Sequence, residues 1–435
     1  MLVSPTSACF RRAASSSVRT TTSRSLATAA ADLGFETSTV DGIKIATKDI
    51  AGPITTLSFV IKAGSRYATV PGVAHALQRF AYQNTPKRSG LRLTRETELL
   101  GGSLTSVLTR DSIVLTARFF KDDLPYFFEA LSDVFAQPTL ARHELAEIVA
   151  PLLKLDAKLA DAEAAFVASE AINSAAYRKG LGLPLYAQAT DSISIDNVRS
   201  YKDAAYTKSN LAIVASGTDI NTLSDLVSTY LETAPAGTAS TTNASTFYGG
   251  ELRIPSTAGN VLTFGVAAEP SPTFNVLASV LGGASSIKWS YGASLLSATA
   301  GKAYAKVTPY SGSSLLTVTA TGSPAEIKSA GAAAVDALKT VATGVSPEIL
   351  KKGIAGAKFD ALSALEGAAG LASVGEILLS SGSVPAAAKI ISEIESVTAD
   401  SVKSLAEKIL SEKVAAAAVG KVSELPYVDE LGLKA

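Results

Sequence analysis

The stretch Gly72–Tyr82, GVAHALQRFAY, decides the fold of this chain. It follows Pro71 and carries apolar side chains at helical spacing, which predicts the start of an amphipathic helix. His75 and Arg79 are four residues apart, so both project from one face of that helix, with Gln78 beside them. This face is the first candidate for a functional site.

The spacing of His75, Gln78 and Arg79 is that of the H-x-x-E-H motif of zinc hydrolases, in which two imidazoles hold the metal and the carboxylate activates water. Only the first His is present. Gln78 is a neutral amide in place of the carboxylate, and Arg79 is a permanent cation in place of the second ligand. The pattern predicts a degenerate site with no catalytic residue and no bound metal. A residually active peptidase that holds zinc near His75 is the open alternative.

This degenerate motif and the sequence around it resemble the pitrilysin-type metallopeptidase family, and within it the non-catalytic members found in mitochondria. The resemblance covers the chain from about Gly34 to its end and continues through Glu98–Leu104, Arg110–Leu115 and Lys121–Pro125. It implies an α+β fold of two homologous domains, each a mixed β-sheet with helices packed on one face. The two domains are expected to close like a bowl around an inner surface.

A second helix is predicted where apolar residues recur at i, i+3, i+4, i+7 and i+8 from Leu145 through Leu153. The resemblance implies that this helix supplies a third zinc ligand, a Glu, in active relatives. An alignment anchored on Asp156 places that position at Pro151, within one or two residues. A proline inside a helix removes one backbone hydrogen bond at a cost of about 3 kcal/mol. We therefore expect a kinked or bulged helix at Pro151 and no ligand there.

Composition excludes several functional classes. A chain of 435 residues with 47% hydrophobic and 18% charged residues is typical of a globular protein of two or more domains. The formal net charge of zero gives no support to nucleic-acid binding. Cys9 and Met1 are the only residues of their types, and His143, expected at a helix start, is the only other histidine. We therefore expect no haem, iron–sulfur or copper centre and no cofactor.

Residues 1–26 are predicted to be a mitochondrial transit peptide. Residues 1–31 contain four Arg, many Ser and Thr, and no acidic residue, which is typical of such peptides. Arg24-Ser25-Leu26 resembles a matrix-protease cleavage signal, so the mature chain is expected to start near Ala27. A disordered tail is the alternative. No apolar run reaches about 18 residues, so no transmembrane helix is expected.

The rest of the chain divides into residues 33–233, an N-terminal peptidase-like domain, residues 234–246, a linker of small residues, and residues 247–435, a C-terminal peptidase-like domain. Strands are expected over Val40–Ile50 and Ile54–Ala63, ahead of the first helix. The second half repeats the first about 204 positions later: Pro347–Ile349 follows His143–Leu145, and Ser401–Leu405 follows Asn197–Tyr201. A period this long indicates duplicated domains, because solenoid repeats span ~20–50 residues.

The resemblance implies a structural role as a core subunit of respiratory complex III, the ubiquinol–cytochrome c oxidoreductase, needed for its assembly. Such a subunit is peripheral on the matrix side of the mitochondrial inner membrane. Its expected partners are core protein 1, cytochrome b, the c-type cytochrome subunit and the iron–sulfur protein. The alternative is the non-catalytic, presequence-binding alpha subunit of the mitochondrial processing peptidase. That subunit has a longer, more Gly-rich loop in its second domain, so the short stretch Leu281–Trp289 favours the core-subunit hypothesis.

Overall fold

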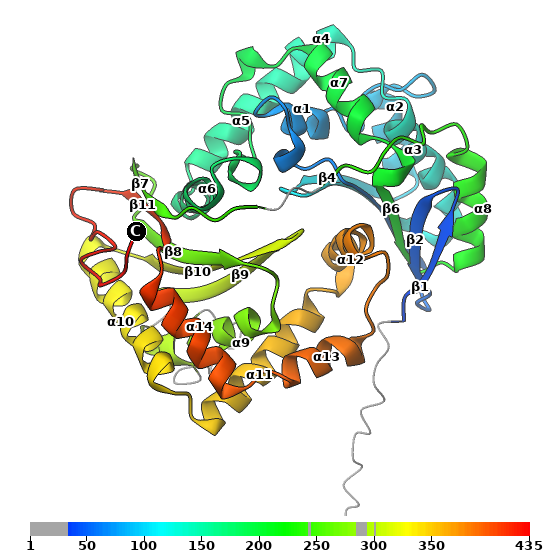
Figure 1. The fold of residues 1–435 in the computed structure, drawn as a ribbon. Coiled ribbons are helices and arrows are strands. Elements are labelled where there is room, and N and C mark those ends of the chain that lie inside the picture. The colour runs from blue at the N-terminus through cyan, green and yellow to red at the C-terminus, as the bar shows by residue number, and fades with distance from the viewer. Residues whose placement is uncertain (1–33, 242–244, 284–293, 300–301) are drawn as a thin grey trace, which may run out of the picture.

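The structure, a computed structural model, describes residues 34–241, 245–283, 294–299 and 302–435. The described chain forms two halves, each built on one β-sheet, that face each other across the molecule (Figure 1). The predicted transit peptide, residues 1–26, and most of the predicted loop Leu281–Trp289 lie outside the described residues.

The first half contains a six-stranded sheet and the helices that cover it. Its strands are β1 Glu36–Val40, β2 Ile43–Lys48, β3 Ile54–Ile61, β4 Ser103–Leu108, β5 Ile113–Phe120 and β6 Leu211–Ser216. Its helices are α1 Val73–Arg79, α2 Gly90–Leu99, α3 Leu124–Ala136, α4 Arg142–Glu144, α5 Ala150–Asp161, α6 Ala164–Tyr177, α7 Ile195–Ala205 and α8 Ile220–Tyr230. The strand order is β1-β2-β6-β3-β5-β4, with β2 and β6 parallel and all other neighbours antiparallel.

The second half contains a five-stranded sheet. Its strands are β7 Gly250–Pro255, β8 Val261–Ala268, β9 Ala303–Tyr310, β10 Ser313–Thr321 and β11 Ala415–Gly420. Its helices are α9 Pro272–Leu281, α10 Pro324–Thr343, α11 Pro347–Ser363, α12 Gly367–Ser381, α13 Ala387–Glu395 and α14 Ala399–Ser411. The order β7-β11-β8-β10-β9, with β7 and β11 parallel, repeats the first sheet without β1. The predicted α+β fold of two homologous mixed-sheet domains is confirmed.

Each half has a core between its sheet and its own helices. In the first half, Phe128 and Phe135 of α3 pack edge-on against Phe59 of β3, with ring centroids 5.5 and 6.4 Å apart. In the second half, α9, α10 and α14 bury apolar residues such as Val276, Leu338 and Val402 against the strands. Burial of these large side chains is the main source of stability of each half.

The other face of each sheet is covered by a helix from the opposite half. Helix α12 of the second half packs on β2, β6 and β3, where Val374 and Leu378 contact Ala212 and Val214. Helix α6 of the first half packs in the same way on β11 and β8 (Figure 1). The prediction of helices on one face of each sheet was therefore incomplete, because the second face of each sheet is covered by a helix of the other half.

Close approach of α12 to the first sheet depends on a glycine. A Cβ on Gly375 would lie 2.4 Å from Val60 Cγ2 of β3, which is too close for two carbon atoms. The small residue therefore lets the helix backbone approach the sheet directly.

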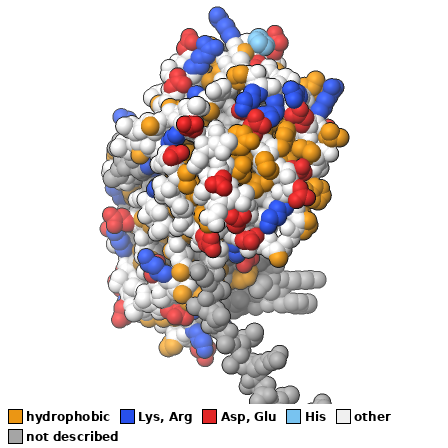
Figure 2. Space-filling view, turned by 90° about the vertical axis from the view of Figure 1, so that its right-hand side faces the viewer, with side chains coloured by type: hydrophobic (Ala, Val, Ile, Leu, Met, Phe, Trp, Pro, Cys, Tyr) orange, Lys and Arg blue, Asp and Glu red, His pale blue; other side chains and the backbone are white. Residues whose placement is uncertain are grey.

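Within the described residues, no single helix is long and apolar enough to cross a membrane, although α11 and α12 together pass the same test despite meeting at 92°. Figure 2 shows the side of the molecule that is on the right in Figure 1. Charged side chains of both signs surround a group of hydrophobic ones there, so this face has no field of a single sign.

Candidate functional site

Helix α1 places the predicted motif at the edge of the first core. Its N-cap, Gly72, has a φ of +86°, and a Cβ at this position would lie 2.6 Å from Ala187 Cβ. Glycine is therefore required at the helix start by both backbone conformation and packing. The helix that follows is short and mostly buried, with His75 at 0% exposure.

The hydrogen bonds of His75 define which ring nitrogen carries the proton. The backbone N–H of Ala187 donates to Nδ1 at 3.2 Å, so Nδ1 presents its lone pair. Nε2 therefore carries the hydrogen and donates it to Asp156 Oδ2 at 3.0 Å. Burial lowers the pKa of His75 from 6.5 to about 4. The carboxylate of Asp156 raises this pKa, but its effect is smaller than that of burial. The ring is neutral at pH 7, and neither nitrogen is free to bind a metal.

Arg79 binds the same carboxylate from the next turn of α1. Its Nε donates to Asp156 Oδ2 at 2.6 Å and its Nη2 donates to Oδ1 at 2.5 Å, which makes a bidentate ion pair. The Asp156 side chain is 12% exposed and that of Arg79 is 34% exposed. Both carboxylate oxygens are therefore used by the guanidinium, and one of them also accepts the His75 proton.

Gln78 faces a different partner. Its amide Nε2 donates to the backbone oxygen of Ser106 at 3.0 Å and to Ser106 Oγ at 2.7 Å. Ser106 belongs to β4, one of the two edge strands of the first sheet. The residue at the position of a catalytic carboxylate thus fastens α1 to the sheet and does not face the His75–Asp156 pair.

The second predicted helix supplies Asp156 to this site. Asp156 lies five residues after Pro151, the position predicted to replace the third zinc ligand. A π-helical turn over Leu145–Val149 runs directly into α5, and the Ala150 N–H bonds to Leu145 O. Pro151 follows this turn at the start of α5 and is exposed. The expected bulge is therefore present. Pro151 takes no part in the hydrogen bonds of His75 and Arg79. The residue of this helix that does is Asp156, which the sequence analysis used only to anchor an alignment.

The residues at this site do not fit a catalytic zinc ion. Within the described part of the chain, no group of three His, Cys, Asp or Glu side chains could hold a metal. His75 and Asp156 have ligand chemistry, but their donor atoms are occupied and the Arg79 cation lies where a second cation would be repelled. What this arrangement can do is hold α1, α5 and the loop at Tyr186–Ala187 together. The rings of Tyr186 and His75 lie 4.7 Å apart.

Comparison with known proteins agrees with this geometry. Residues 44–189 match the family described as Insulinase (Peptidase family M16), and residues 192–356 match the Peptidase M16 inactive domain. The chain is 38% identical to cytochrome b-c1 complex subunit 2, mitochondrial, of Neurospora crassa over 95% of both chains. It is 39% identical to the protein of that name from Yarrowia lipolytica, over 91% of this chain and 96% of the relative. The chain belongs to peptidase family M16. The protein of that name from Mus musculus is 26% identical over 92% of both chains.

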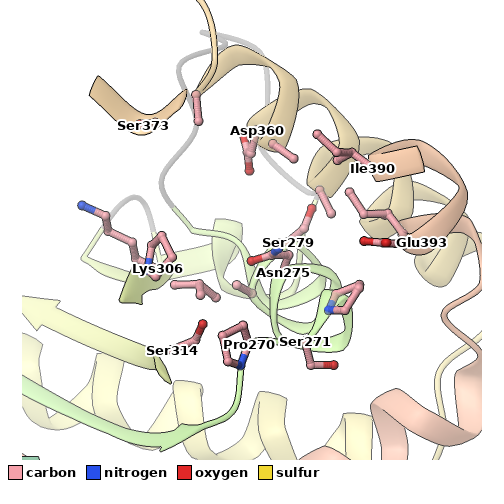
Figure 3. A pocket seen from close by; sticks show the side chains of 18 of the residues that line it. Pro270, Ser271, Asn275, Ser279, Lys306, Ser314, Asp360, Ser373, Ile390 and Glu393 are labelled. Carbon is pink, nitrogen blue, oxygen red and sulfur yellow. The ribbon is translucent and has the colours of Figure 1, made fainter. Parts of the chain in front are cut away.

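Within this M16 chain, residues of both halves line an open cavity of about 1430 Å³. Most of its wall comes from α9, α11, α12 and α13 of the second half. Figure 3 shows Asp360 of α11 pointing toward Asn275 and Ser279 of α9. Burial raises the pKa of Asp360 above its ordinary value. The sequence marks Asp360 only as the counterpart of Asp156 in the internal repeat, and it does not indicate that residues of α9 and α11 line a cavity, because these helices share no motif.

The turn between β4 and β5 joins the two halves at the wall of this cavity. Asp111 accepts a hydrogen bond from Arg66 Nη1 at 2.6 Å and another from the Ser311 N–H of the second half at 2.9 Å. Glu376 of α12 accepts hydrogen bonds from the hydroxyls of Ser112 at 2.5 Å and Thr109 at 3.0 Å. Burial raises the pKa of Glu376. These contacts fix the relative position of the halves by hydrogen bonds with defined directions.

Proposed function

We propose that this M16 chain is a non-catalytic core subunit of the mitochondrial cytochrome b-c1 complex, respiratory complex III, with a structural role in its assembly. The observation that carries the proposal is the His75–Arg79–Asp156 network, in which each group that could bind zinc is already bonded to another side chain or to backbone. Relatives named as subunit 2 of that complex align over nearly the whole chain, which supports the same assignment.

The proposal includes a location and partners. The Arg-rich, acid-free residues 1–26 support import into mitochondria, with residues 33–233 and 247–435 as the two domains and 234–246 as the linker. The subunit is then peripheral on the matrix side of the inner membrane. Its partners in this proposal are core protein 1, cytochrome b, the c-type cytochrome and the iron–sulfur protein.

The test is native purification of the mature chain from mitochondria through a C-terminal tag. We expect the absorption bands of b-type and c-type haems in the purified material, together with a second M16 chain. Purification of the chain without any haem protein, or as a zinc-containing peptidase, would contradict the proposal. Inductively coupled plasma mass spectrometry of the same sample measures the zinc.

A second candidate, the presequence-binding alpha subunit of the mitochondrial processing peptidase, is favoured by the cavity between the halves. Its volume and mixed polar and apolar wall could accommodate an extended peptide. Binding of a fluorescent presequence peptide distinguishes the two candidates. Saturable binding to the chain supports the second candidate if the purified material also contains a second peptidase subunit and no haem protein.

A further inference from the structure

The second sheet lacks a strand that the first sheet has. In the first half, β1 pairs antiparallel with the outer side of β2, from Glu36 opposite Thr47 to Val40 opposite Ile43. The equivalent outermost strand of the second half is β7, which pairs only with β11 among the described strands. The internal duplication therefore leaves one strand position vacant beside β7.

The backbone of β7 presents free hydrogen-bonding groups at this position. Gly250 and Ser256 donate their N–H groups to Val414 O and Gly420 O, both at 3.1 Å, on the side of β11. Because successive residues of a strand turn their backbone groups to alternate sides, Glu251 and Arg253 direct N–H and C=O outward. No described residue bonds to these outward groups.

Exposed apolar side chains flank the same edge. Tyr248, just before β7, is 45% exposed and Leu252 within it is 40% exposed. Tyr427 is 49% exposed, and the guanidinium of Arg253 lies 3.8 Å from its ring centroid. A soluble protein usually protects a sheet edge with solvated charges or proline. In β7, Glu251 and Arg253 pair with each other and are mostly buried, and Pro255 removes one N–H group only at the end of the strand.

The start of β7 has a basic environment. Arg178 lies 4.4 Å from the ring centroid of Tyr248, and Lys413 packs against Gly249. Neither cation has a carboxylate within ion-pair distance among the described residues. Arg178 adopts a φ of +59°, which is unfavourable for a side chain of this size, so its packing over Tyr248 is maintained at some conformational cost.

We propose that the outer edge of β7 binds an extended segment of another subunit, which adds a strand antiparallel to β7 in the place that β1 takes beside β2. The bound segment carries apolar side chains on both faces, one covering Leu252 and another covering Tyr427, because Leu252 and Arg253, over which Tyr427 lies, point to opposite faces of the sheet. Its C-terminal end lies beside Tyr248 because of the antiparallel direction, and acidic groups there pair with Arg178 and Lys413. The inference deepens the proposed function and rests on it, since it names one contact of the assembled complex.

The N-terminal segment of the chain itself is a poor occupant. The described chain begins beside β1, on the opposite side of the molecule from β7 (Figure 1). After the predicted cleavage about seven residues precede it, and they reach ~24 Å when fully extended. In an antiparallel pair of two copies, the start of one β7 would lie beside Pro255 of the other, which offers Arg178 and Lys413 no acidic partner, so a second copy fits this edge less well.

The first test is electron cryo-microscopy of the native assembly purified through the chain. We expect an extended segment of a different subunit at ~4.8 Å from β7, hydrogen-bonded to the backbone of Glu251 and Arg253. Solvent, lipid, a helix or a second copy of the chain at this edge would refute the inference. Failure of the chain to enter any haem-containing assembly would instead refute the proposed function, so the two failures are distinguishable.

The second test compares Leu252→Lys with Leu91→Lys, a matched change at an exposed leucine of α2. Hydrogen exchange of the segment 248–255 is measured in both purified assemblies. We expect roughly fivefold faster exchange only in Leu252→Lys, because the added charge faces the bound strand. Equal exchange in both variants, or rapid exchange of this segment already in the wild-type assembly, would refute strand addition even if Leu252→Lys assembled poorly.

Discussion

Replacement of Asp156 by alanine tests whether the former metal site now has a structural role. Asp156 accepts two hydrogen bonds from Arg79 and one from His75, and it links α5 to α1. In Asp156→Ala, the Nε2–H of His75 remains in a site with 0% exposure and has no acceptor. The guanidinium of Arg79 is about a third exposed, so water can replace part of what it loses.

The expected magnitude follows from these two losses. A buried donor without an acceptor costs about 1–3 kcal/mol, and the partly solvated Arg79 pair adds about 1 kcal/mol. We therefore expect Asp156→Ala to lower the free energy of unfolding by about 2–4 kcal/mol. Asp156→Asn keeps one acceptor oxygen without the charge, so its cost is about 1–2 kcal/mol.

The assay is urea denaturation of the mature chain followed by circular dichroism, with Asp161→Ala as the matched control. Asp161 is the last residue of α5, is exposed and has no ion pair among the described residues, so its replacement should change stability by less than about 0.5 kcal/mol. If Asp156→Ala and Asp161→Ala unfold at the same urea concentration, the network does not stabilise the fold and the reasoning fails.

Three further predictions concern pH, packing and metal. Because the pKa of His75 is about 4 in the folded chain and 6.5 when unfolded, the unfolded chain takes up the proton first. The free energy of unfolding should therefore fall as the pH is lowered from 6.5 to 4, by up to about 3 kcal/mol, and this part of the pH dependence should be absent in His75→Gln. Gly375→Ala should destabilise by about 1–3 kcal/mol through its contact with Val60, whereas Gly52→Ala, with nothing within 4 Å, should be nearly neutral; melting temperatures of both variants check this. The double variant Gln78→Glu/Arg79→His should bind about one Zn²⁺ per chain in calorimetry, since it supplies a second imidazole and frees Asp156; a wild-type chain that bound zinc equally well would contradict the site described above.

Much of the first site could be predicted from local sequence. Pro71, Gly72 and the apolar spacing after them indicate α1, which spans Val73–Arg79. The pairing of Asp156 with His75 and Arg79 was not predicted, because Asp156 lies on another helix 77 residues after Arg79 and helix periodicity does not show which side chains of two distant helices meet. A usable signal was present: Asp156 is three residues after Leu153 and seven after Val149, both fully buried, and a carboxylate on a buried face needs a partner.

The start of the first sheet shows a second missed signal. The strand expected over Val40–Ile50 corresponds to β2, Ile43–Lys48. The preceding strand β1, Glu36–Val40, and the turn at Asp41-Gly42 that joins it to β2 were not predicted. Both turn residues have positive φ, +50° and +83°, as a two-residue hairpin requires, and Asp-Gly is a strong sequence signal for it. The exchange of α6 and α12 could not be predicted in this way, because an Ala-rich or Gly-rich helix shows that it packs closely but not against which sheet.

That exchange has a consequence for how the polypeptide acquires its shape. The six strands of the first half are complete at Ser216, yet one side of them stays bare until residues 367–381 are available. Until that helix docks, the folding chain exposes an apolar surface, and the second sheet depends on α6 in the same way, so neither half expressed alone should remain in solution.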